Sequence, residues 1–261
     1  MLLWLSLAGP AAAATAVTIL CDNGYPPYSY EENGEAKGLY NDILRAAFAQ
    51  MPDYQVEIQP VPWRRGLDAL AKGRSFALFP PYYRPAERPY MDYSRPILEE
   101  RLVVFVRAEV ARARSIDIFP EDYVGLRIGI NAGFSPVQNP LYHRMLGKGL
   151  LTESFAKDNR SNLLKLHRGR IDAYINDRLS ILWELGNLQQ RGELPGDARE
   201  LLIEGPTLSV EQGYLGFTNR NPHDFPYKED FIRQLNAALD SLEQAGAIQQ
   251  TVMYYQSPAV D

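Results

Sequence analysis

The sequence predicts an α/β fold with two similar lobes, each a mixed, mainly parallel sheet flanked by helices. Strand-like segments alternate with segments that carry a helical stripe of apolar residues. A pattern at residues 70–81, LAKGRSFALFPP, returns at residues 166–177 as LHRGRIDAYIND, with Leu, Gly-Arg and Ala at the same spacing. At 261 residues, 46% of them apolar, the chain is long enough for two lobes with their own cores.

The first lobe is predicted from the N-terminal third of the chain. Its elements are a strand, a turn-rich loop, a helix, a strand, a helix and a strand, at residues 16–22, 23–38, 39–51, 54–61, 63–73 and 75–80. Leu39, Ile43 and Leu44 begin the stripe of the first helix, and Gly73 is the stop signal of the second. We place lobe 1 at residues 15–105 and 214–261, and lobe 2 at residues 106–213.

The remaining elements complete this picture. Strands are expected at residues 101–109, within 122–133, at 171–177 and within 212–222, with a helix starting near Ser135-Pro136 and a C-terminal helix that breaks at Gly246. The strand-like segments near residues 101–108 and 211–218 are placed where the chain would cross between the lobes and return. Each copy of the repeat predicts a helix end, a glycine cap and a strand, so Pro81 and Asp177 follow equivalent strands. Ligands of open parallel sheets bind at such strand exits.

Composition and motifs exclude several kinds of function. The net charge of −5 and the pI near 5.4 argue against a general nucleic-acid binder, which carries a basic face. The three histidines are scattered without metal-ligand spacing, and no phosphate loop, nucleophile elbow or HExxH motif is present. We therefore expect no cofactor and no metal.

The N-terminal segment predicts export. Residues 1–14 combine an apolar run with Ala12 and Ala14 at the small-x-small spacing of a signal peptidase site, so we expect a signal peptide and a soluble periplasmic protein. A buried or anchoring helix is the alternative, because no Lys or Arg precedes the run. Cys21 is the only cysteine, which excludes an internal disulfide and predicts a buried strand residue.

The loop at residues 80–97, PPYYRPAERPYMDYSRPI, is the first candidate for ligand binding. Arg84 and Arg88 follow a predicted strand, and the planar fork of an arginine matches a carboxylate with two parallel hydrogen bonds. The alternative is a surface ion pair for either arginine, for example with Glu87 or Asp92.

Three further residues could complete a binding site. Tyr25 and Trp63 could form flat walls against a ligand, and core packing is the alternative for both. Asp177 could accept hydrogen bonds from a ligand ammonium, and its alternative is the N-cap of a helix beginning at residue 178.

Four segments together resemble the bacterial extracellular solute-binding proteins of family 3, which have the type II periplasmic binding protein (venus flytrap) fold. They are GYPPYSYEENGEAKGLYNDIL, PAERPYMDYSRPI, DYVGLRIGINAG and GRIDAYIND, at residues 24–44, 85–97, 122–133 and 169–177. The resemblance implies that Arg88 clamps a ligand α-carboxylate with help from Ser135, that Asp177 holds the α-ammonium, and that Tyr25 and Trp63 are aromatic walls.

This chain also departs from the family pattern. Pro81 and Tyr83 stand where the family usually has hydroxyl side chains, Tyr40 replaces the first aspartate of the helix start, and Arg84 is an added cation. We include Tyr83 and Arg84 among the expected ligand-binding residues, and the ligand need not be a standard amino acid.

The resemblance implies a monomeric binding protein without catalysis, which captures an amino acid or a related small carboxylate and presents it to an ABC transporter permease. One alternative is an enzyme similar to cyclohexadienyl dehydratase, in which Asp177 or Glu87 would be the general acid. The other is a ligand-sensing module that acts through a separate signalling partner.

Overall fold

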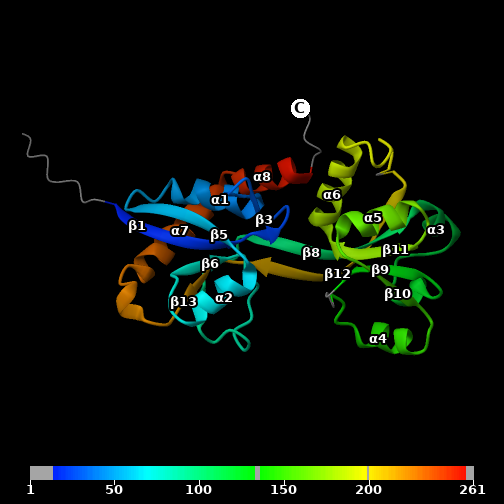
Figure 1. The fold of residues 1–261 in the computed structure, drawn as a ribbon, viewed down its shortest axis with the longest axis horizontal. Helices are drawn as coiled ribbons and strands as arrows, with labels where there is room; N and C mark the ends of the chain where they lie inside the picture. Colours follow the sequence, from blue (N-terminus) through cyan, green and yellow to red (C-terminus); the bar gives the residue numbers. More distant parts are fainter. Residues whose placement is uncertain (1–13, 133–135, 199, 257–261) are drawn as a thin grey trace, which may run out of the picture.

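The protein has two lobes joined by a pair of long antiparallel strands, β8 (Leu98–Arg107) and β12 (Leu202–Gly213) (Figure 1). The computed structural model describes residues 14–132, 136–198 and 200–256. Lobe 1 lies on the left in Figure 1 and lobe 2 on the right, and β8 and β12 run between them. Among the described residues, no helix has the length and apolarity needed to span a membrane.

Lobe 1 is built on a five-stranded sheet with the order β5-β1-β6-β13-β7. These strands are Tyr54–Val61, Thr15–Asp22, Ala77–Phe79, Gly216–Thr218 and Met91–Tyr93. The strand β1 is parallel to β5 and β6, whereas β13 is antiparallel to β6 and β7. The turn-rich loop that follows β1 folds into a small antiparallel sheet of β2 (Gly24–Tyr25), β3 (Ser29–Glu32) and β4 (Glu35–Lys37), which the sequence did not predict.

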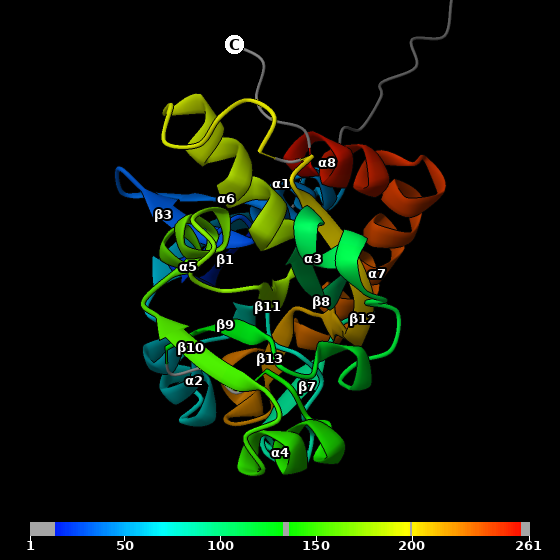
Figure 2. The ribbon, with the colours of Figure 1, turned by 90° about the vertical axis from the view of Figure 1, so that its right-hand side faces the viewer.

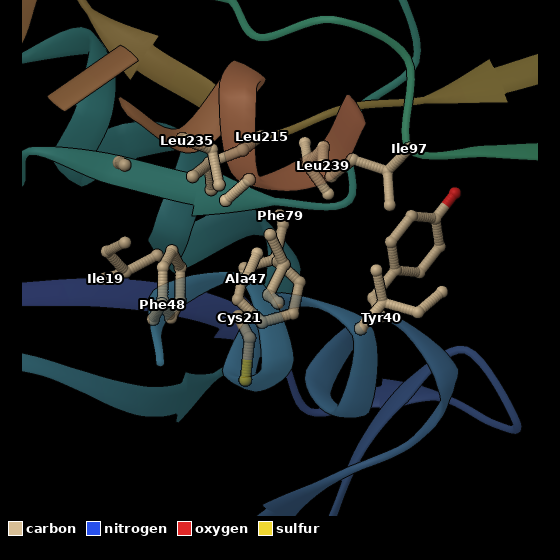
Figure 3. Close-up of a cluster of buried hydrophobic side chains, with 14 of the residues drawn as sticks. Ile19, Cys21, Tyr40, Ala47, Phe48, Phe79, Ile97, Leu215, Leu235 and Leu239 are labelled. Carbon is tan, nitrogen blue, oxygen red and sulfur yellow. The ribbon is translucent and has the colours of Figure 1, made fainter. Parts of the chain in front are cut away.

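The two faces of this sheet bury different residues of β1, since alternate side chains of a strand point to opposite sides. Ile19 and Cys21 pack into the cluster shown in Figure 3, with α1 (Leu39–Phe48), α7 (Lys228–Gln244) and α8 (Ala247–Gln256). Leu20 packs on the other face with α2 (Trp63–Ala71). Cys21 is thus the buried strand residue that was predicted, and burial raises the pKa of its thiol to about 11.

Lobe 2 repeats the arrangement of lobe 1. Its sheet has the order β10-β9-β11-β8-β12, in which the new strands are Thr152–Ala156, Arg127–Asn131 and Ala173–Asp177. The run β5-β1-β6 in lobe 1 corresponds to the run β10-β9-β11 in lobe 2, so β6 and β11 occupy equivalent positions. Gly73 and Gly169 end the preceding helices with φ of 64° and 66°, the left-handed conformation that glycine adopts without strain. The two-lobed mixed α/β architecture is confirmed, and parallel pairs make up two of the four neighbouring pairs in each sheet.

The helices of lobe 2 lie on both faces of its sheet. Figure 2 shows α5 (Asn159–His167) and α6 (Arg178–Gln190) on one side of the sheet and α4 (Pro140–Gly147) on the other. The short helix α3 (Ala108–Ala113) follows β8, and single 3-10 turns lie at Glu121–Tyr123 and Pro222–Asp224. The face under α5 and α6 buries Phe105 and Tyr174, whereas the opposite face buries Val104 and Val106.

Two boundary predictions were wrong. The helix expected near Ser135-Pro136 begins at Pro140, because the Asn139 side chain accepts a hydrogen bond from the backbone N–H of Leu141 at 2.8 Å. The second crossing strand starts at Leu202, earlier than the expected residue 211. Gly205 and Pro206 obscure this strand in the sequence, and the pairing with β8 shifts register around them.

Candidate functional site

Three of the predicted binding residues follow the ends of sheet strands: Tyr25 follows β1, Arg88 follows β6, and Asp177 is the last residue of β11. The hairpin after β1 reaches lobe 2 directly: the Tyr28 hydroxyl donates a hydrogen bond to Asp177 Oδ2 at 3.0 Å. The Ser180 hydroxyl of α6 donates to the Pro26 carbonyl at 3.4 Å. The hairpin after β1 in lobe 1 is therefore in contact with the end of β11 in lobe 2, and ligands of open α/β sheets bind at the carboxyl ends of such strands.

Arg88 and Trp63 lie together in lobe 1. The Arg88 guanidinium lies over the Trp63 ring, 5.7 Å from its centroid, and its Nη1 donates to the Tyr82 carbonyl at 3.2 Å. Trp63 is the first residue of α2 and also packs against the small core beneath that helix. Within the described part of the chain, no Asp or Glu forms an ion pair with Arg88, so its charge is held in place but not neutralised.

Arg84, by contrast, already has an anionic partner. Its Nη2 lies 2.7 Å from Glu211 Oε1 on β12, and its guanidinium lies over the Tyr82 ring. An ion pair was the alternative for Arg84, but the partner is Glu211 and not the expected Glu87 or Asp92. Sequence could not identify this partner, because Glu211 is distant along the chain and only the crossing of β12 brings it close.

Tyr83 belongs to a separate aromatic cluster. Its side chain is 55% exposed, and its ring lies 5.0 Å from that of Tyr93 and 6.1 Å from that of Tyr214. These rings line a surface hollow of about 460 Å³ together with Pro85. Among the described residues, Tyr83 has no hydrogen bond or ring contact with Tyr25, Arg88 or Asp177.

Asp177 ends β11 and caps α6. Its Oδ1 accepts a hydrogen bond from the Ser180 N–H at 2.8 Å, so the N-cap alternative is what the structure shows. The carboxyl group is 8% exposed, and burial raises its pKa to about 6, while hydrogen bonds from Ser180 and Tyr28 act in the opposite direction. The Ser180 N–H, the Tyr28 hydroxyl and the Arg101 N–H already direct hydrogens at this carboxylate, which can accept about four hydrogen bonds, so about one position is left for a ligand donor.

Tyr25 leads to a residue that the sequence prediction missed, Glu100 on β8. Glu100 is 3% exposed, and it accepts hydrogen bonds from three tyrosine hydroxyls, Tyr25 and Tyr40 at 2.6 Å and Tyr82 at 2.5 Å. We call these four residues the Glu100 cluster. Burial, followed by the nearby charge of Asp177, raises the pKa of Glu100 to about 7, against the effect of the three hydroxyl donors.

The sequence did contain a signal for Glu100. In LEERLVVFVR, residues 98, 100 and 102 share one face of the strand, so Glu100 is in phase with Leu98 and Leu102 while Glu99 and Arg101 face outward. A carboxylate in an apolar phase is unusual and marks a buried polar site. Ser135, the last of the predicted residues, lies outside the described residues.

Cavities between the lobes lie near part of this site. One of about 410 Å³ is lined by Tyr28 and Asp177, together with Leu98 and residues of α8. A larger one of about 770 Å³ lies between the β3–β4 hairpin and α6 and includes Tyr30 and Trp183, but none of the predicted ligand residues. The candidate site is defined by the hydrogen bonds of Arg88 and Asp177, because the volume of a cavity alone does not identify a ligand. The described residues contain no group of three His, Cys, Asp or Glu side chains placed to hold a metal ion.

Comparison with known structures supports the fold. The second substrate-binding domain of GlnP from Lactococcus lactis, in its open conformation, is 16% identical with a TM-score of 0.70, over 95% of this chain and 99% of that one. A substrate-binding protein of a polar amino acid ABC uptake transporter from Streptococcus thermophilus is 19% identical with a TM-score of 0.68, over 92% and 85%. An ancestral amino acid-binding protein described as a precursor of cyclohexadienyl dehydratase is 16% identical with a TM-score of 0.59, over 93% and 95%.

Sequence comparison defines the family. No match was found among curated protein sequences. The model of the bacterial extracellular solute-binding proteins, family 3, matches residues 17–257, which is nearly the whole chain. With the two lobes and their paired crossing strands, this match shows that the chain belongs to the family 3 bacterial extracellular solute-binding proteins.

Proposed function

We propose that this protein is an exported binding protein that captures an amino acid, or a related small polar carboxylate, between its lobes and delivers it to an ABC importer. We assign residues 15–105 and 214–261 to lobe 1, residues 106–213 to lobe 2, and residues 1–14 to a signal peptide. Two structural neighbours support this ligand class, one described as an ancestral amino acid-binding protein and one as a substrate-binding protein of a polar amino acid ABC uptake transporter. We further propose that the protein acts as a monomer.

The observation that carries the proposal is the unneutralised cation of Arg88 in lobe 1, with the buried carboxylate of Asp177 in lobe 2. Arg88 is fixed by Trp63 and by the Tyr82 carbonyl, so little conformational entropy remains to be lost when it binds an anion. An amino acid carries one anionic and one cationic group. A ligand that bridges Arg88 and Asp177 would favour the closed arrangement of the lobes through its different contacts in the two states.

Tyr25, Trp63, Tyr83, Arg84 and Ser135 are the further residues that we propose for the ligand site. Tyr25 and Trp63 offer ring faces beside the two charged groups. Arg84 would have to exchange its partner Glu211 for the ligand, which makes it a weaker anchor than Arg88.

A thermal-shift screen tests the proposal. Purified protein is melted with each of the standard amino acids, with polyamines and with small carboxylates. Ligand present at about 100 times its Kd stabilises the folded state by about 2.7 kcal/mol, which raises the Tm by several degrees. If no amino acid or carboxylate raises the Tm, the proposal is wrong. A rise with polyamines alone would contradict the role of Arg88.

The raised pKa of Asp177 supports a second candidate, the dehydratase-like enzyme. With a pKa of about 6, Asp177 is half protonated about one unit below neutral pH, and a buried acid in this state can donate a proton to a leaving hydroxyl. Glu87, the other acid considered, is exposed. Incubation with prephenate or arogenate distinguishes the two functions, because only the enzyme would form an aromatic product.

A further inference from the structure

The Glu100 cluster has four short oxygen–oxygen contacts, but its three tyrosine hydroxyls supply only three hydrogens. The three tyrosine hydroxyls each donate to the Glu100 carboxylate, and the Tyr25 and Tyr82 oxygens also lie 3.1 Å apart. If Glu100 is ionised, three hydroxyl hydrogens must serve four contacts, and the contact between Tyr25 and Tyr82 has none.

A proton on Glu100 supplies the missing hydrogen. Glu100 Oε2–H can then donate to Tyr25, Tyr25 to Tyr82, and Tyr82 back to Glu100 Oε2, while Tyr40 continues to donate to Oε1. Every short contact in the cluster is then satisfied, which is the condition that buried polar groups normally meet. The geometry of the cluster therefore accommodates both protonation states and favours a shared proton when the site is empty.

The charged and titratable groups around Glu100 come from every element packed against it. Tyr25 lies on β2, Tyr40 on α1, Tyr82 after β6, and Asp177 at the end of β11. Tyr28 is also near, since its pKa is raised by burial and then by the charges of Asp177 and Glu100. On β12, Glu211 is directly opposite Glu100 in the strand pairing, and Arg84 holds it in an ion pair. Within the described part of the chain, no Lys, Arg or His forms an ion pair with Glu100 or Asp177.

The cluster is also connected to both proposed ligand anchors. The Tyr82 carbonyl accepts the hydrogen bond of Arg88, while the Tyr25 ring stacks on Tyr28 at 4.9 Å, and Tyr28 donates to Asp177. Figure 3 shows Tyr40 at the edge of the lobe 1 core beside Ile97, with its hydroxyl directed away from the other labelled side chains. The core of lobe 1 thereby holds a donor against the crossing strand β8.

We propose, building on the proposed function, that Glu100 is a positioning and specificity-determining residue whose proton is released when a ligand's positive group binds at Asp177. The ligand ammonium stabilises nearby negative charge, so it favours ionised Glu100. The O–H bond of Glu100 breaks and the proton passes to the buffer. The Tyr25 hydroxyl then turns from Tyr82 to the carboxylate, to which Tyr40 and Tyr82 already donate. By linkage, the ligand binds more tightly as the pH rises, and ligands without a positive group lose this contribution.

Calorimetric titration of each of the twenty standard amino acids into the full-length mature chain tests this coupling. Buffers with different ionisation enthalpies report the number of protons released. If binding lowers the pKa of Glu100 by one unit from about 7, about 0.4 proton is released at pH 7 and affinity rises about threefold between about pH 6.5 and about pH 8. Most of the titration of Asp177, with a pKa of about 6, lies below this range.

Three variants separate the roles. Glu100→Gln keeps the shape but cannot ionise, so we expect no proton release from this position and an affinity that is flat above about pH 6.5. Tyr40→Phe removes a donor that stabilises the charged form, so the release should move to higher pH with its size unchanged. Glu99→Gln is the matched control, because Glu99 is exposed on the same strand and paired with Arg101.

Each outcome decides between defined alternatives. Proton release in the wild type and Glu99→Gln, but not in Glu100→Gln, supports the inference. If Glu100→Gln does not fold, Tyr40→Phe decides in its place. A shift of its proton release to higher pH supports the inference, because a purely structural role of Glu100 would leave the pH dependence of proton release unchanged. Binding with equal proton release in wild type and variants overturns the inference and leaves the proposed function standing. If no amino acid binds to the wild type at any pH, the inference is overturned, and the thermal-shift screen with the other small carboxylates decides the proposed function.

Discussion

Replacement of Arg88 by alanine is the sharpest test of the ligand site. Arg88 is the candidate carboxylate anchor, and its guanidinium makes one backbone hydrogen bond at 3.2 Å and one ring contact at 5.7 Å in the protein itself. Loss of one partner from a hydrogen-bonded charge pair typically costs about 2 to 5 kcal/mol. We therefore expect the affinity for any carboxylate ligand found by thermal shift to fall by about 30-fold to several thousand-fold.

The effect on folding should be much smaller, because Arg88 contributes little to the stability of the empty protein. Its hydrogen bond and its cation–π contact are each worth about 0.5 to 1 kcal/mol. The assay is calorimetric titration of the variant, with a urea unfolding curve to show that the fold persists. Arg88→Lys should be intermediate, because an ammonium keeps the charge but not the planar fork.

Arg64→Ala is the matched control, since Arg64 is an exposed arginine in the first turn of α2, next to Trp63. Its affinity should equal that of the wild type. If Arg88→Ala retains affinity within about threefold, a difference of about 0.6 kcal/mol, then Arg88 is not the carboxylate anchor.

Three further predictions concern stability. Gly213→Ala should lower the free energy of unfolding by about 1 to 3 kcal/mol, because the new Cβ would lie 1.7 Å from the buried Tyr40 hydroxyl. An unchanged midpoint of urea unfolding would show that Tyr40 can move away from the new methyl group without cost. Phe231→Ala should cost about 3 to 5 kcal/mol, since this fully buried ring packs against Phe48, Tyr54 and Phe76, and a loss below about 1 kcal/mol would contradict that packing. Burial raises the pKa of Glu100 from its ordinary 4.5 to about 7, so the folded state binds an extra proton between these values. The ionisation of Glu100 should lower the free energy of unfolding by on the order of 3 kcal/mol as the pH rises through this window. Glu100→Gln should lack this contribution and keep the part of the fall that comes from Asp177, with its pKa of about 6.

The agreement between sequence and structure is greatest where local pattern decides the outcome. The strand at Tyr54–Val61 has the predicted bounds, and Gly73 and Gly169 end their helices as expected. Agreement is weakest where proline and glycine interrupt a pattern, as at the start of β12 and between Pro136 and Pro140. There the local signals are ambiguous, and pairing with β8 or capping by Asn139 decides the boundary.

For the candidate site, the sequence predicted Arg84, Arg88 and Asp177 as charged ligand-binding residues, but it did not predict their partners, and it missed Glu100. Arg88, Arg84 and Asp177 follow strands, so their position near the sheet edges could be predicted from chain order. Whether each charge was free or paired depended on distant residues: Glu211 neutralises Arg84, whereas Arg88 has, among the described residues, a ring and a carbonyl as its contacts and no acidic partner. The Glu100 cluster joins β2, α1, the loop after β6 and β8, and its raised pKa arises from burial and from Asp177 in the other lobe. Such effects require the tertiary structure, because desolvation and proton sharing depend on what surrounds a group in space and not on its neighbours along the chain.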